Sequence, residues 1–214
     1  MNTIYNAQLM LNSLDRYVNT FEWGSLTKGK QVILECFLKI ATREGISGTS
    51  MRNLASAAGL RPPTIYSHFP NGRDEIISAA LRWHYNNFAK GLQLALRACS
   101  TAEEFWAELT RYHITQQLKR PENDMWDILV AMDNIVRELP DDLRAEVNDW
   151  EEFCDSMYES IAMDLGVEKK QRNTRVIRKL FDSVGSWWNW DGTDEHIEEA
   201  IRYALVLSYA ILKI

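Results

Sequence analysis

The chain has 214 residues, of which 46% are hydrophobic and 25% charged. This length and apolar content are enough for one large globular domain or two small ones with a buried core. The longest apolar runs are about half of the roughly 20 residues that a membrane helix needs, so no spanning segment is expected. The N-terminus has no basic region followed by an apolar block, which argues against a signal peptide.

The net charge of −6 is divided unevenly along the chain. Residues 1–91 hold ten Lys and Arg against six Asp and Glu, whereas residues 92–214 hold fourteen against twenty-four. The resulting charges of +4 and −10 suggest a basic working end on an acidic body. Chance scatter of surface charge explains so small a basic surplus equally well.

Cysteine usage is sparse. Cys36, Cys99 and Cys154 are odd in number, far apart and in no paired spacing. This pattern predicts buried, reduced thiols in a cytoplasmic protein. It gives neither a disulfide framework nor a zinc site, and no cofactor is predicted.

Most apolar residues recur at helical spacing, and glycine and proline are few. We therefore expect an all-α fold of about nine helices with an extra N-terminal helix. The extra helix covers about residues 3–21, where an apolar stripe steps by three and four residues. The stripe consists of Ile4, Ala7, Leu11, Leu14, Val18 and Phe21. Packing of this stripe within the fold is favoured over a separate partner site.

The next predicted helix opens after Thr27 and stops at Gly45, which suits a left-handed C′ position. Thr49 is then expected to cap a short helix, SMRNLASAA, that ends at Gly59. The stretch RPPTIYSHF follows as a second short helix. Its paired prolines suit a first turn, because proline already has a helical φ and no backbone donor is needed there.

The remaining helices are delimited by their own start and stop signals. A long helix is expected over about residues 73–100, and Thr101 with Glu104 forms a capping box for a helix to about residue 120. The further expected helices cover about residues 121–138, 140–165, 170–190 and 194–213.

The two short helices, TSMRNLASAAG and LRPPTIYSHF, are joined by a glycine turn and have the sequence form of a helix-turn-helix. The outward face of the second helix carries Arg61, Thr64, Ser67 and His68 and no acid. Such a face suits the phosphate-lined groove of a duplex. A plain structural hairpin of two helices is the alternative.

From Thr27 to about Leu81 the chain resembles the DNA-binding domain of the TetR family of transcriptional regulators. The matching elements are, in order, REG, the capped TSMRNLA, AAG, TIYSHF, and the pairs Arg73-Asp74 and Ile76-Ile77. The resemblance implies a DNA-binding domain at residues 25–78. The extra helix precedes it at residues 1–24, and an effector-binding and dimerisation domain follows at residues 79–214.

The resemblance also implies which residues contact DNA. Arg52 stands where the family often reaches base edges or phosphate, and an arginine there could pair with guanine. The recognition helix begins with Pro63 and Thr64 facing the groove, and Tyr66 matches a phosphate-contacting position. Partial packing of Tyr66 in the domain core is the alternative. The complete predicted set is Ser50, Arg52, Arg61, Pro63, Thr64, Tyr66, Ser67, His68 and Arg73.

Two residues depart from the family pattern. Arg61 stands where Ser or Thr usually caps the recognition helix, so a cap is lost and a charge is gained. Gly72 looks like one residue inserted before Arg73.

For the remainder of the chain, the resemblance implies a homodimer through the last two helices and a small-molecule effector bound among the central helices. Two apolar helices from each copy would form a four-helix bundle. The candidate effector residues are Trp106, His113, Gln117, Trp126, Trp150 and Phe153. For each ring, simple filling of the core is the alternative.

The expected function is that of a ligand-responsive transcriptional regulator. It would act as a repressor that binds a palindromic operator in double-stranded DNA as a dimer and is released by a small hydrophobic or aromatic effector. The sequence shows no HExxH, no G-x-S-x-G and no glycine-rich phosphate loop, so an enzyme is not expected. Two alternatives stay open: a helical adaptor or ligand-binding protein without DNA binding, and a small helical enzyme using a buried carboxylate or His113.

Overall fold

The computed structural model describes residues 4–20, 26–136, 139–168 and 173–214, and all regular structure within them is helical. This confirms the predicted all-α fold. Phe21 and the predicted helix start at residue 170 lie outside the described residues. The helices are α1 (Tyr5–Thr20), α2 (Lys28–Glu44), α3 (Met51–Ala57), α4 (Pro62–His68), α5 (Arg73–Leu96), α6 (Ala102–Lys119), α7 (Pro121–Val136), α8 (Asp141–Asp164), α9 (Thr174–Asp182), α10 (Val184–Trp187) and α11 (Asp194–Leu212).

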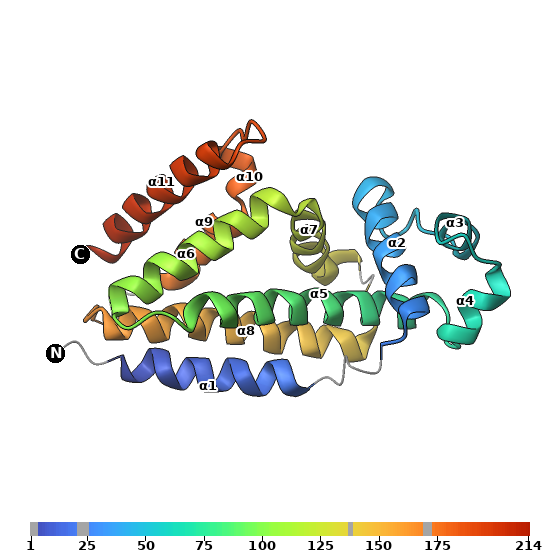
Figure 1. Ribbon diagram of the computed structural model, residues 1–214, viewed down its shortest axis with the longest axis horizontal. Coiled ribbons are helices and arrows are strands. Elements are labelled where there is room, and N and C mark those ends of the chain that lie inside the picture. The colour runs from blue at the N-terminus through green and yellow to red at the C-terminus, as the bar shows by residue number, and fades with distance from the viewer. Residues whose placement is uncertain (1–3, 21–25, 137–138, 169–172) are drawn as a thin grey trace.

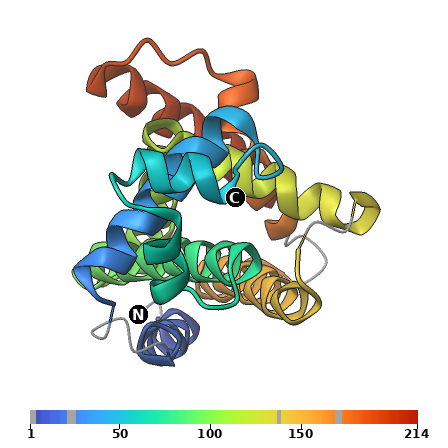
Figure 2. The same ribbon diagram turned by 90° about the vertical axis from the view of Figure 1, so that its right-hand side faces the viewer.

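The molecule has a helical body with a smaller unit at one end (Figure 1). In the body, α1, α5 and α8 run side by side, and α6 packs on α5, α8, α9 and α11. Helices α2, α3 and α4 form the smaller unit, opposite the end where α1 starts and α11 finishes. Figure 2 shows this unit facing the viewer.

Helix α1 packs within the fold, as its apolar stripe predicts. Ala7, Met10 and Leu14 are buried against α5 and α8. The carboxylate of Asp164, at the end of α8, accepts a hydrogen bond from the backbone N–H of Ala7 at 2.7 Å and another from Asn6. Those N–H groups have no partner inside α1, so the carboxylate satisfies donors that the helix start leaves free.

The small unit has the local structure of a helix-turn-helix. Ser50, rather than the predicted Thr49, caps α3, because its side chain accepts from the backbone N–H of Asn53 while the Thr49 hydroxyl donates back to Gly45. Gly59 has a φ of +65° in the turn that follows α3. A residue with a Cβ would be strained there, so glycine fixes the turn between the two helices.

Helix α4 begins with the paired prolines in its first turn, which confirms the sequence prediction. Arg61 is the N-cap residue and makes no side-chain hydrogen bond to the helix. Ile65 is the buried residue of this short helix, and Phe69 is buried directly after it. The helix is therefore held mainly by these apolar contacts and by the fixed φ of proline.

One predicted helix is divided. The segment expected at residues 170–190 forms α9 up to Asp182 and the single turn α10 from Val184 to Trp187, with Ser183 between them. The Ser183 hydroxyl donates to the carbonyls of Lys179 and Leu180, which competes with continued helix hydrogen bonding. The predicted long helix after residue 73 also ends earlier than expected, at Leu96.

The apolar core has two parts. One fills the body, and the other holds α2 to α5 together and also takes Trp126 and Leu129 from α7 and Leu143 and Val147 from α8. The small unit is therefore packed directly on the body through α7, and α5 runs from one part into the other.

Candidate nucleic-acid interface and effector cavity

The outer face of the α3–α4 pair is accessible and contains no acid. Arg52 on α3 is exposed, as are Arg61, Pro63 and Ser67 at α4, while Thr64 is half-buried. Tyr66 is 48% exposed, so its ring is available to a partner although one edge lies 3.4 Å from where a Cβ on Gly72 would stand. Basic and hydroxyl groups without carboxylates form a surface that attracts a phosphate backbone.

His68 lies against the first turn of α2. A Cβ on Gly29 would stand 2.7 Å from the imidazole ring, so only glycine leaves room for this contact. The neighbouring Lys30 places its Nζ 5.2 Å from the centre of the Phe69 ring. His68 thus joins α4 to α2, and its ring is only partly accessible.

Three of the predicted DNA-binding residues make side-chain hydrogen bonds within the fold. The Ser67 hydroxyl donates to the Thr64 carbonyl at 2.7 Å. Ser50 caps α3, and Arg73 donates from Nη2 to the carbonyl oxygen of Ile46 at 2.9 Å. Arg73 therefore ties the start of α5 to the loop before α3. The sequence gives no sign that the Arg73 side chain bonds to a residue 27 positions earlier.

A small cavity lies inside the body between α5, α6, α7, α8 and α9, and is called the inner cavity below. Four of the six predicted effector residues, His113, Gln117, Trp126 and Trp150, line it. Its volume is only about 50 Å³. Trp106 does not line it: this ring is fully buried, and its Nε1 donates to the Ser208 hydroxyl at 2.9 Å.

Three wider cavities adjoin the inner one. A cavity of about 510 Å³ between α7, α8 and α9 shares Asp127, Glu151 and Arg178 with it. A cavity of about 820 Å³ lies between α2, α5, α6 and α7 and shares the walls His84, Phe88 and Asn123. A cavity of about 530 Å³ lies between α1, α5 and α8 and shares Tyr85 and Trp150. Phe153 lines this last cavity rather than the inner one.

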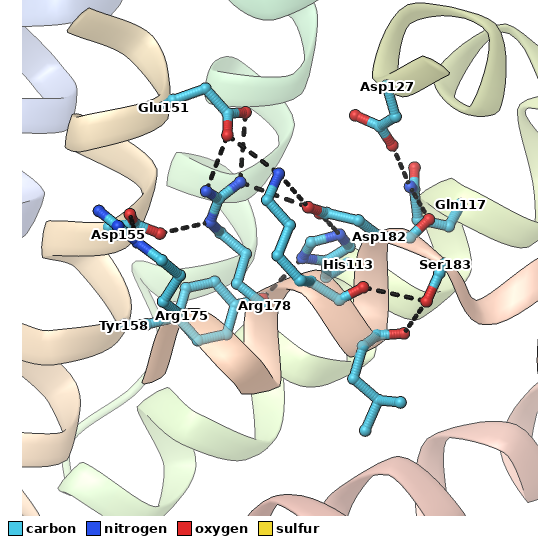
Figure 3. A network of polar contacts seen from close by, with 12 residues as sticks. His113, Gln117, Asp127, Glu151, Asp155, Tyr158, Arg175, Arg178, Asp182 and Ser183 are labelled. Carbon is cyan, nitrogen blue, oxygen red and sulfur yellow. Dashed lines mark hydrogen bonds and ion pairs between the residues drawn. The ribbon is translucent and has the colours of Figure 1, made fainter. Parts of the chain in front are cut away.

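A buried polar network forms one wall of the inner cavity (Figure 3). At its centre is Arg178 of α9, whose Nη2 lies 2.9 Å from Glu151 and whose Nε lies 2.7 Å from Asp155. Its Nη1 lies 3.3 Å from Asp182, one turn further along α9. Because a buried arginine needs charged partners, these three carboxylates compensate its burial. Glu151 and Asp155 also fix α9 against α8.

His113 is held from both sides. Its Nε2 lies 3.1 Å from Oδ1 of Asp182, and its Nδ1 lies 2.6 Å from the hydroxyl of Tyr158. A carboxylate only accepts, so Nε2 carries the proton in this contact. In the neutral ring, Nδ1 then accepts from the Tyr158 hydroxyl.

The two aspartates beside Gln117 ionise very differently. Burial, followed by the charge of Asp182, raises the pKa of Asp127 to about 7. Burial also opposes ionisation of Asp182, but the hydrogen bond and charge of His113 and two cations of α9 outweigh it and lower its pKa to about 2. Gln117 donates to the Asp127 carboxylate at 2.8 Å and to the Asp182 carbonyl at 2.7 Å.

Sequence reasoning missed Arg178, Asp182 and Asp127. The first two stand four residues apart in a helix that was expected to be an apolar dimerisation helix. Two opposite charges at that spacing within an apolar stripe were the available signal for a buried ion pair.

The outer face of α9 and α11 is only partly apolar. Several residues of the predicted dimer stripe on α11, such as Ile197, Ile201 and Ala204, are buried against the chain's own body. The large apolar side chains that α9 and α11 leave exposed are Val176, Tyr203 and Val206. These three are therefore the candidates for contact with a second copy.

Metal and membrane features are not found in the described ranges. No group of three or more His, Cys, Asp or Glu side chains there could hold a metal ion. None of the described helices is long and apolar enough to cross a bilayer.

Comparison with known proteins finds both a sequence family and similar folds. Residues 33–80 match the family model of bacterial regulatory proteins, tetR family. No curated protein matches the chain significantly. The solved structures described next share at most 19% sequence identity with this chain, so they show a similar fold and nothing about function.

Three of these structures cover most of the chain. The superantigen PfiT has 19% identity and a TM-score of 0.65 over 85% of this chain and 97% of its own. A tetR-family regulatory protein from Rhodococcus RHA1 has 14% identity and a TM-score of 0.71, over 87% of this chain and 97% of its own. A proposed transcriptional regulator from Saccharomonospora viridis, in complex with choline, has 19% identity and a TM-score of 0.64, over 83% and 94%.

Proposed function

We propose, from the match of residues 33–80 to the model of the tetR family of bacterial regulatory proteins, that the protein is a ligand-responsive repressor of transcription. It binds a palindromic operator as a homodimer and leaves it when a small apolar or aromatic effector enters the body. The observation that carries the proposal is the acid-free, exposed face of the α3–α4 pair on a helix-turn-helix fold. The family match describes regulatory proteins rather than enzymes.

In the proposed complex, α4 enters the major groove and α3 crosses the backbone. Arg52, Thr64 and Pro63 are proposed to face bases, whereas Arg61 and Tyr66 contact phosphate. Ser67 and His68 add polar groups along the same side of α4. We retain Ser50 and Arg73 as backbone-positioning residues, because each already orders the start of a helix next to this face.

The homodimer is proposed to form through α9 and α11, where Val176, Tyr203 and Val206 are exposed. A two-fold dimer places two recognition helices about one DNA turn, roughly 34 Å, apart or somewhat more. The proposed domains are residues 25–78 for DNA binding and 79–214 for effector binding and dimerisation, with residues 1–24 as an extra helix. Such a protein would act in the cytoplasm, where its free thiols stay reduced.

The effector is proposed to act through α5 and α7. Both helices line the inner cavity, α5 continues from the DNA-binding unit, and Trp126 of α7 belongs to the same apolar core as Ile33 and Phe37 of α2. A ligand that moves α7 must therefore repack α2. The protein would then have two arrangements of α7 and α2, one that binds DNA and one that does not. The ligand changes DNA affinity only if it binds one of them more tightly, and the size of the change is set by the difference between its two binding free energies.

Binding to operator DNA tests this function. Fragments selected from the source genome should bind the protein specifically, with an affinity that falls steeply with salt because several phosphates are neutralised. Arg52→Ala and Tyr66→Ala should weaken binding while the dimer persists in sizing runs. A flat salt response, or equal affinity for unrelated sequences, would instead favour a helical adaptor or ligand-binding protein without DNA binding.

A further inference from the structure

The inner cavity has walls that suit a positively charged ligand. Tyr85 stacks on Trp150 with the ring centroids 4.9 Å apart, and Phe88 meets the same Trp150 edge-on at 6.4 Å. Trp126, from α7, lines another side. The faces of such rings carry negative partial charge and attract a cation.

The charged side chains that line the inner cavity have more negative than positive groups. Three carboxylates, of Asp127, Glu151 and Asp182, line the cavity with one guanidinium, that of Arg178. Arg178 is already paired with Glu151 and Asp182. Among the described side chains, Asp127 is bonded only to the neutral amide of Gln117. Lys179, just outside the cavity, also pairs with Glu151 and Asp182, so Asp127 is the one of these three carboxylates that no cation contacts among the described side chains.

Polar groups without partners point to the same place. Both amide atoms of Asn123 and the indole N–H of Trp126 are buried and have no hydrogen-bond partner in the described part of the chain. The two residues are 4% and 1% exposed, and both line the cavity. Buried polar groups are nearly always satisfied in native proteins, so three orphan atoms on one wall indicate a guest. The Asn123 oxygen can face a positive group, whereas the N–H groups of Asn123 and Trp126 need an acceptor, such as a hydroxyl oxygen, on the same guest.

The size of the cavity limits what can enter. A volume of about 50 Å³ takes a small group, and Asn123, His84 and Phe88 line both this cavity and the one of about 820 Å³ beside it. We propose that the effector is an organic cation whose ammonium group lies in the inner cavity, against Asp127 and the aromatic walls, with the rest of its body in the larger cavity. This inference rests on the proposed function, since it names the effector class for the same regulatory site.

Protonation of Asp127 gives the proposal a second signature. Burial and the charge of Asp182 hold the pKa of Asp127 at about 7, and an arriving cation would lower it. At roughly pH 6, binding should therefore release a proton from Asp127 to the buffer, and at roughly pH 9 it should release none. The groups around Asp127 are His84 on α5, Gln117 on α6, Glu151 on α8, and Lys179 and Asp182 on α9.

Three probes of one shape separate charge from size. Choline is a cation, and 3,3-dimethylbutan-1-ol is its neutral analogue with carbon in place of the quaternary nitrogen. The third probe, 3,3-dimethylbutanoate, has a carboxylate in place of the alcohol end and is an anion. In calorimetric titrations of the full-length protein, choline should bind with a Kd of about 1 mM or tighter, and the alcohol at least about tenfold more weakly. Equal or tighter binding of either uncharged or anionic probe, or no heat from choline, overturns the proposal.

A matched pair of variants locates the charge. Asp127→Asn keeps the acceptor for Gln117 and removes only the charge, so choline affinity should fall about tenfold or more. Glu195→Gln, at an exposed position in the first turn of α11, should leave it unchanged. Wild-type affinity in Asp127→Asn overturns the proposal. If that variant does not fold, the buffer dependence of the wild-type binding heat at pH 6 and pH 9 decides the question, and its absence counts against the cation.

DNA binding is measured without any of the three probes, so the proposed cationic effector and the proposed DNA-binding function can each be rejected independently of the other. Specific operator binding with no preference for choline removes the cation and leaves the regulator. Preferred choline binding without specific DNA binding supports the cation class and removes the regulator.

Discussion

Arg73 at the start of α5 donates a hydrogen bond from Nη2 to the carbonyl oxygen of Ile46, 27 residues earlier in the chain, at 2.9 Å. The bond crosses from the start of α5 to the loop that leads into α3. A half-buried guanidinium in this position orders the helix-turn-helix unit, whether or not it also reaches DNA.

Replacement of Arg73 by Gln should therefore lower stability as well as DNA affinity. Loss of a charge-assisted hydrogen bond at a half-buried site is expected to cost about 1 kcal/mol or somewhat more, measured as the free energy of unfolding in urea. Arg52→Gln, on the exposed face of α3, is the control and should change stability by less than about 0.5 kcal/mol. An Arg73 variant of wild-type stability and weakened DNA binding would show a pure phosphate contact.

Substitution of Arg61 by Ser should move stability and DNA affinity in opposite directions. Arg61 has φ −90° and ψ 147°, which suits a capping residue, but its side chain makes no cap hydrogen bond. Because Pro62 and Pro63 have no N–H, the first donor that the introduced hydroxyl could reach is the N–H of Thr64, which already donates to the Arg61 carbonyl at 2.9 Å. The hydroxyl can only share this donor, so the free energy of unfolding should rise by about 0.5 kcal/mol at most.

The same substitution removes a charge beside the proposed groove. Operator affinity should fall, and the slope of log affinity against log salt should become shallower by about two, because the dimer loses one phosphate contact in each copy. Arg61→Ala is the matched control, since it loses the charge without gaining a cap. If Arg61→Ser keeps the full salt slope, Arg61 does not face phosphate.

The elements around the helix-turn-helix could be predicted well because their signals are local. Paired prolines, the glycine at residue 59 and the apolar positions at helical spacing each act within a few residues, and the structure has α4 and the turn where they indicate. Thr49 and Ser50 show the limit of this reasoning. Both can cap, and the choice depends on where the chain leaves the preceding loop.

The interior could be predicted less well, because long-range packing decides which side of a helix faces a cavity. Trp106 and Trp150 are both large apolar rings on central helices, yet one bonds to Ser208 in the core and the other lines two cavities. Asp127 and Asp182 are 55 positions apart in the sequence, and only the packing of α7 and α9 on α6 brings them to the same glutamine.

Asp127 should make the protein less stable as the pH rises towards 8. Its pKa of about 7 in the fold is above the ordinary value of 3.8. The native state thus holds a proton that the unfolded chain loses, and the resulting cost is absent below pH 3.8, grows between these two values and is complete above pH 7. Asp127→Asn removes this cost.

The measurement is the difference in unfolding free energy between Asp127→Asn and the wild type, at roughly pH 5 and pH 8. The variant should gain on the order of 2 kcal/mol between the two conditions. The comparison with wild type is needed because His84, whose pKa burial and Arg120 lower to about 3, contributes in the opposite direction below pH 6.5. A constant difference across the pH range would show that Asp127 ionises normally.

Val206 should be essential for the dimer but dispensable for the fold of one chain. Its side chain is 66% exposed on α11 and is not part of the apolar core of the body. A glutamate there adds no buried charge to the single chain, so stability should change by less than about 0.5 kcal/mol. In a two-fold interface the same position occurs twice, and two like charges would be desolvated close together, which strongly disfavours association.

Val206→Glu should therefore elute as a monomer in sizing runs where the wild type is a dimer, and its operator affinity should fall about tenfold or more because one copy reads only one half-site. Leu94→Glu, on α5 with 63% exposure, is the control and should remain dimeric. A dimeric Val206→Glu with wild-type operator affinity would place the interface elsewhere than on α9 and α11.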